Sequence, residues 1–102
     1  MSIEGNKPWL LDKVHVILSN GTYRAQPPSK VVQNGQTIIW DAHGKPLKLT
    51  DDPRIANPQY SQNDSVITAT IKANVGDVFA YTMTCDDSLV EGNSPPTIVV
   101  DP

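Results

Sequence analysis

Eight residues, Val78 to Cys85, limit the fold of this chain more than any other stretch. Phe79, Tyr81, Met83 and Cys85 recur at every second position, and the residues between them are small or polar. Successive side chains of a β-strand point to opposite faces, so this spacing predicts a strand with one buried face. The one cysteine of the chain is therefore expected to end a buried strand face.

Short strands separated by turn signals account for the remaining sequence. Asn20-Gly21 and Asn34-Gly35 are typical turn dipeptides. The polar stretch 50–64 lacks periodicity and is predicted to be a loop, and no segment shows the apolar period of a helix. This pattern predicts an all-β fold, a Greek-key two-sheet β-sandwich. Its strands are expected at 13–19, 22–26, 30–33, 37–41, 47–49, 65–73, 78–85 and 97–100. Its core is expected to contain Val14, Val16, Leu18, Ile38, Trp40, Phe79, Tyr81 and Met83.

Length and charge favour one small domain and exclude several partners. The 102 residues, 38% hydrophobic and 19% charged, are typical of a single globular unit. We expect residues 1–12 to be an N-terminal lead-in and residues 13–102 to be the domain. A net charge of −3 with scattered basic residues argues against nucleic acid as a partner. No apolar run reaches the roughly 20 residues of a membrane helix.

The N-terminus gives two expectations for localisation. Residues 1–6 lack the basic start and apolar core of a signal peptide, and one cysteine allows no internal disulfide. If Met1 is the natural start, a cytoplasmic protein is expected. If the sequence is a processed form carrying a new methionine, a periplasmic or exported protein is expected instead.

Read in order, these features resemble the cupredoxins, β-sandwiches of the plastocyanin and azurin type. The stretch 31–40 is similar to the family's glycine turn followed by a strand with an inward aromatic, here Trp40. Pro46 follows, then the strand that ends at Cys85, and then the closing strand 97–100. The resemblance implies a cupredoxin-like fold, with Cys85 at the position of the family's copper thiolate. It also implies an exported or periplasmic location.

Most ligands of the family's copper site are nevertheless missing. A type 1 site needs a thiolate, two imidazoles and usually an axial thioether. The residue after Pro46 is Leu47 rather than histidine, and the loop 86–96 contains neither histidine nor methionine. Met83 suits core packing better than ligation. No cofactor or metal is therefore expected. The alternative is copper held by Cys85 and His43, whereas His15 is expected to be a surface or edge histidine rather than a ligand.

Two function classes follow, and neither is enzymatic, because no catalytic motif is present. The favoured class is a binding or structural module without a complete type 1 site, for an unidentified protein or small molecule, as a monomer or weak dimer. The alternative is a copper-binding electron carrier with an altered ligand set. A third hypothesis is an unrelated immunoglobulin-like module. A Ca²⁺ site in the acidic loop after Cys85 is a weaker hypothesis. Binding is expected from two loops, through His43, Gly44, Lys45, Asp86, Asp87, Glu91 and Asn93.

Overall fold

The computed structural model describes residues 13–92 and 95–101, and this part of the chain is all-β. It contains no helix that would be long and apolar enough to cross a membrane. The strands are β1 (Lys13–Ser19), β2 (Thr22–Gln26), β3 (Ser29–Gln33), β4 (Thr37–Asp41), β5 (Leu47–Leu49), β6 (Ile55–Tyr60), β7 (Val66–Ile71), β8 (Val78–Ala80), β9 (Met83–Cys85), β10 (Ser88–Leu89) and β11 (Thr97–Asp101).

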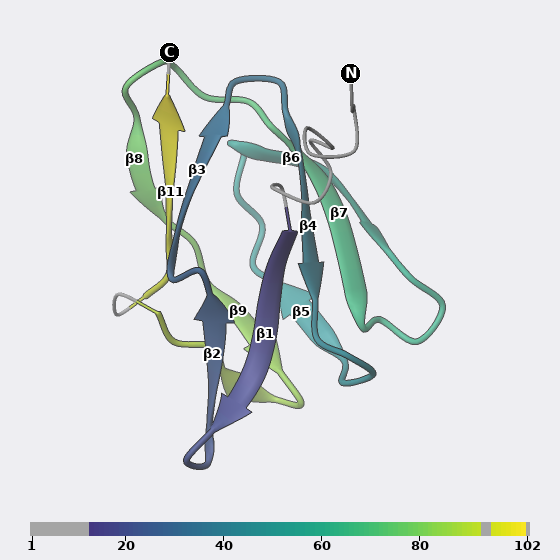
Figure 1. Ribbon diagram of the computed structural model, residues 1–102. Coiled ribbons are helices and arrows are strands. Elements are labelled where there is room, and N and C mark those ends of the chain that lie inside the picture. The colour runs from purple at the N-terminus through teal and green to yellow at the C-terminus, as the bar shows by residue number, and fades with distance from the viewer. Residues whose placement is uncertain (1–12, 93–94, 102) are drawn as a thin grey trace, which may run out of the picture.

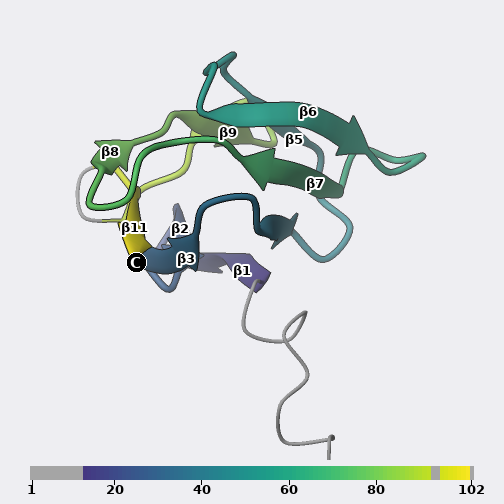
Figure 2. The same cartoon turned by 90° about the horizontal axis from the view of Figure 1, so that it is seen from above.

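Three sheets enclose the core (Figure 1). A five-stranded sheet has the order β2-β1-β4-β7-β6, and two three-stranded sheets have the orders β10-β9-β5 and β3-β11-β8. The pairs β1–β4 and β3–β11 are parallel, and the other pairs are antiparallel. Viewed from above, β1, β2, β3 and β11 form one layer, and β5, β6, β7 and β9 form the other (Figure 2). The five-stranded sheet therefore contributes strands to both layers. This arrangement is consistent with a β-sandwich.

The core follows the period-two patterns of the strands. Trp40 and Met83 are fully buried, and Tyr81 meets Trp40 edge to face with ring centroids 5.4 Å apart. Seven of the eight predicted core residues are buried, but the prediction for Leu18 is wrong, because its side chain is 59% exposed. β1 pairs with β4 only through residues 13–15. Among the described strands, β2 alone flanks the end of β1, so Leu18 projects beyond the core.

The predicted loop 50–64 contains a strand, β6, at the edge of the five-stranded sheet. Its pairing with β7 shifts register between Ala56 and Gln59, and Asn57 within that irregularity has a φ of 53°. A bulge interrupts the alternation of faces, and an edge strand also tolerates Pro58. Because of these two features, the sequence of β6 lacks the alternating pattern from which a strand is predicted.

The predicted strand from Val78 to Cys85 is two strands in different sheets. β8 pairs with β11, whereas β9 pairs with β5 and β10, so the chain passes between sheets at Tyr81 and Thr82. The alternating side chains nevertheless all stay buried, because both strands face the same core. The predicted loop 86–96 also contains the short strand β10.

Candidate functional site

Three turns of two residues gather at the end of the molecule that is lowest in Figure 1. They are Asn20-Gly21 between β1 and β2, His43-Gly44 between β4 and β5, and Asp86-Asp87 between β9 and β10. All six residues have positive φ. Positive φ at both central residues defines the type I′ turn, whose twist matches that of paired strands.

Two of the predicted binding loops lie side by side at this end. The Asp86 amide donates a hydrogen bond to the Pro46 carbonyl (2.8 Å), and the Leu47 amide donates to the Asp64 carbonyl (2.8 Å). These bonds join the β4–β5, β6–β7 and β9–β10 connections around a depression of about 550 Å³. Lys48, Tyr60 and Asp87 also line it.

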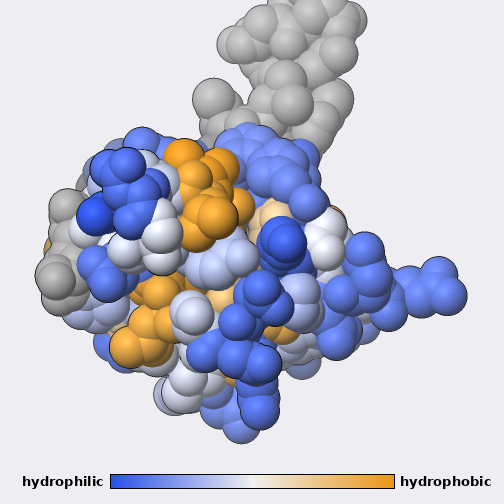
Figure 3. Space-filling model, turned by 90° about the horizontal axis from the view of Figure 1, so that it is seen from below, coloured by the Kyte–Doolittle hydropathy of each residue, from blue (hydrophilic) through white to orange (hydrophobic). Residues whose placement is uncertain are grey.

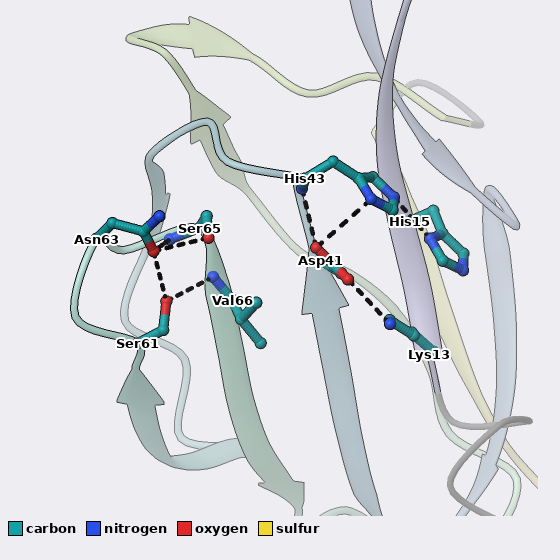
Figure 4. Close-up of polar contacts among 8 residues, drawn as sticks. All are labelled: Lys13, His15, Asp41, His43, Ser61, Asn63, Ser65 and Val66. Carbon is teal, nitrogen blue, oxygen red and sulfur yellow. Dashed lines mark hydrogen bonds and ion pairs between the residues drawn. The ribbon is translucent and has the colours of Figure 1, made fainter.

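A network of side-chain hydrogen bonds fixes the β6–β7 wall of this depression (Figure 4). The Asn63 Oδ1 atom accepts hydrogen bonds from the hydroxyls of Ser61 (3.1 Å) and Ser65 (2.8 Å). The Ser61 hydroxyl in turn accepts one from the Val66 amide (3.0 Å). The network holds Asp64, between Asn63 and Ser65, at a φ of 61°.

Glu91, another predicted loop residue, does not join the turns. Glu91 lies beside β2, where its amide donates to the Tyr23 carbonyl (2.9 Å) and its carbonyl accepts from the Ala25 amide (2.8 Å). Asn93 lies outside the described residues. The part of the predicted surface that comes together therefore consists of His43, Gly44, Lys45, Asp86 and Asp87.

Cys85 ends β9 inside the core. Its side chain is fully buried, and Leu47 of β5 is its direct partner in the strand pairing. Burial raises the pKa of the Cys85 thiol, the Asp86 carboxylate raises it further, and Lys45 opposes both. Because the thiolate is the form that binds metals and attacks electrophiles, these surroundings make Cys85 a poor ligand and a poor nucleophile at neutral pH.

His15 is partly exposed, and it contacts a second histidine rather than lying at a sheet edge. It lies on β1, which is flanked by β2 and β4, and its Nδ1 atom is 2.9 Å from Nε2 of His43 (Figure 4). The parallel pairing of β1 with β4 brings the histidines together, because His15 lies opposite Asp41 and His43 follows in the next turn. Parallel pairing joins strands that are separated in the sequence, so the alternation within either strand does not indicate this contact.

Asp41 completes this group. Its Oδ1 atom accepts the His43 amide (2.9 Å) and lies 3.9 Å from His43 Nδ1, while Oδ2 lies 2.9 Å from Lys13 Nζ. Partial burial acts to raise the pKa of Asp41, but the bonds from Lys13 and the His43 amide outweigh it and lower that pKa overall. The carboxylate is therefore ionised at neutral pH.

Within the described residues, one group of three or more His, Cys, Asp or Glu side chains has its ligand atoms within 4.8 Å of one another. It consists of His15, Asp41 and His43. Cys85 is not a member, so the structure brings His43 to His15 and not into such a group with the thiol.

No protein-family model matches this chain, and no curated protein sequence matches it either.

Proposed function

We propose that this protein is a cupredoxin-like, Greek-key β-sandwich that serves as a non-enzymatic binding module without a complete type 1 copper site. It contacts a protein partner through the end that carries the three turns. The binding surface consists of the His43–Lys45 loop, the Asp86-Asp87 turn and the depression between them.

The proposal rests mainly on the backbone conformation of Asp86 and Asp87. Both have positive φ, 52° and 64°, in a turn that joins β9 to β10. Asparagine followed by glycine is the favoured sequence for such a turn, and glycine adopts positive φ without steric cost. Aspartate at the second position is less stable by about 1 kcal/mol. Strain of this kind is concentrated at functional sites, where the side chain is needed for another purpose.

The chemistry of this surface suits a protein partner. Lys48, Asp64 and Asp87 place charges of both signs around Tyr60, which is 41% exposed. Seen from this end, apolar patches lie among polar side chains (Figure 3). Leu18, two residues before the Asn20-Gly21 turn, is 59% exposed, and Leu89, two residues after Asp87, is 62% exposed. Apolar groups surrounded by a polar rim are typical of non-obligate protein interfaces.

Three observations support the absence of type 1 copper in this proposal. An aliphatic side chain, Leu47, faces the thiol where a ligand would be needed. His43 directs its Nε2 atom to His15. The loop after Cys85 supplies no imidazole or thioether. A copper electron carrier built on Cys85 and His43 is therefore the less favoured function.

Affinity capture with matched charge reversals tests the proposal. The full chain, immobilised, is used to isolate a partner, whose affinity is then measured for the wild type, Asp87→Lys and Asp101→Lys. Asp101 ends β11 at the opposite end of the molecule and is also exposed. We expect Asp87→Lys to weaken binding at least about tenfold, because charge complementarity is lost, and Asp101→Lys to leave it unchanged. Equal effects of the two variants would contradict the proposed surface.

A further inference from the structure

We infer that His15, His43 and Asp41 form a binding site for a divalent transition-metal ion that prefers nitrogen ligands, such as Cu²⁺ or Ni²⁺. The site lies where β1 pairs with β4 and is separate from Cys85. It goes beyond the binding surface proposed above, and it requires no sulfur ligand.

The separation of the two imidazole nitrogens fits tetragonal coordination. His15 Nδ1 and His43 Nε2 are 2.9 Å apart. With metal–nitrogen bonds of about 2.0–2.1 Å, two ligands at a right angle are about 2.9 Å apart, and two at a tetrahedral angle are about 3.3 Å apart. Square-planar and tetragonal sites of nitrogen and oxygen ligands are typical of Cu²⁺ and Ni²⁺. In the metal-free chain a hydrogen bond joins the two nitrogens. An ion bound to both would lie to one side of the line between them, because its bonds are about 2.0 Å long, and the proton of that hydrogen bond would be released to solvent.

Asp41 orients His43 and adds a negative charge beside the metal position. Its Oδ1 atom is 3.9 Å from His43 Nδ1. This favours the tautomer with a proton on Nδ1, which leaves the lone pair of Nε2 free to bind a metal. A carboxylate beside a ligating histidine commonly has this role. The ligand atoms of all three residues lie within 4.8 Å of one another.

The backbone holds the group in place before any metal arrives. His15 and Asp41 are direct partners in the β1–β4 pairing, and the His43 amide is bonded to Asp41 Oδ1. Ligands on paired strands lose little conformational entropy on binding. The His43 side chain is 54% exposed, so an ion can enter and water can fill the remaining positions.

Lys13 provides a test of the role of Asp41, because its ammonium group competes with a metal ion for the same carboxylate. Lys13 Nζ is 2.9 Å from Asp41 Oδ2. If Asp41 binds or faces the metal, Lys13→Gln should tighten binding by removing a positive charge from the site. If Lys13 only stabilised the fold, Lys13→Gln would not tighten metal binding.

The experiment is calorimetric titration of the full chain with Cu²⁺ in a buffer that does not chelate it. The chain contains two histidines, and both lie in the site. We expect one saturable equivalent of copper. His15→Ala and His43→Ala should each weaken it at least about tenfold, as should Asp41→Asn. Lys13→Gln should tighten it, and the control Asp64→Asn should leave it unchanged.

Two controls keep the outcome clear. Circular dichroism checks that each variant is folded, and electron spin-echo modulation of the Cu²⁺ signal detects coordinated imidazole directly. Saturable binding retained by a folded His15→Ala/His43→Ala double variant would overturn the inference, as would the absence of imidazole modulation in the wild type. Asp87→Lys should not affect copper binding, so this test and the partner-binding test can fail independently.

Discussion

Leu47 lies directly opposite Cys85 in the antiparallel pairing of β5 with β9. Directly opposed residues on paired strands have their Cβ atoms about 4.5–5.5 Å apart on the same face of the sheet. Both side chains are buried, with exposed fractions of 3% and 0%. The neighbour of the thiol in the core is therefore a hydrocarbon side chain.

We predict that added Cu²⁺ gives no intense absorption band near the red end of the visible spectrum. Such a band requires a thiolate bound to Cu²⁺, and burial raises the pKa of the Cys85 thiol. Copper at His15 and His43 should give a pale complex instead. The measurement is an absorption spectrum of the wild type and of Cys85→Ser, which should be alike. A strong blue colour that Cys85→Ser abolishes would make the protein an electron carrier.

Trp40 should be the residue whose truncation costs most stability. Its side chain is fully buried and packs against Tyr81. We expect Trp40→Ala to lower the free energy of unfolding by about 3–5 kcal/mol. Leu18→Ala is the control and should cost less than about 0.5 kcal/mol, because Leu18 is mostly exposed. Denaturant titration measures both. Solvent-like fluorescence of Trp40 in a Trp9→Phe background would contradict its burial.

Tyr81 should make the fold sensitive to alkali. Burial raises its pKa from 10.0 to about 12, although the Trp40 indole acts in the opposite direction. Below pH 10 the phenol is protonated in both folded and unfolded chains. Between about pH 10 and 12 unfolded chains lose a proton that folded chains keep, so stability falls as pH rises, by at most about 3 kcal/mol. Tyr81→Phe should reduce this fall. Stability curves of equal slope for the two proteins above pH 10 would disprove it.

Asp87→Gly should stabilise the protein. Glycine adopts the φ of 64° found at Asp87 without the steric cost that a side chain incurs. We expect the free energy of unfolding to rise by about 0.5–1 kcal/mol, measured by denaturant titration. Asp101→Gly is the matched control, and it should destabilise, because Asp101 lies in β11 and glycine weakens a strand. A lower free energy of unfolding for Asp87→Gly than for the wild type would show that Asp87 does not strain the turn.

The all-β class and most strands were predictable because alternation is a local property. Trp40 and Met83 are buried as the period-two pattern predicts. β6 was missed because its register shift between Ala56 and Gln59 disrupts that period. Leu18 fits the pattern but lies where β1 extends past its partner β4, and sequence does not reveal where a neighbouring strand ends.

The candidate site was predictable only in part, because its parts are joined by long-range pairing. The turn chemistry of His43-Gly44 and the acidic pair Asp86-Asp87 is visible in the sequence, and both belong to the surface at one end. The contact of His15 with His43 depends on the parallel pairing of β1 with β4. No local pattern encodes that pairing.

The position of β11 has a consequence for synthesis of the protein. β11 is the middle strand of its sheet, between β3 and β8, and Thr97 bonds to Ser29 across 68 positions of sequence. Among the described strands β3 pairs with β11 alone, so it stays unpaired until β11 has emerged from the ribosome. We expect a nascent chain halted before Thr97 to expose the backbone edges of β3 and β8, and unpaired strand edges favour aggregation.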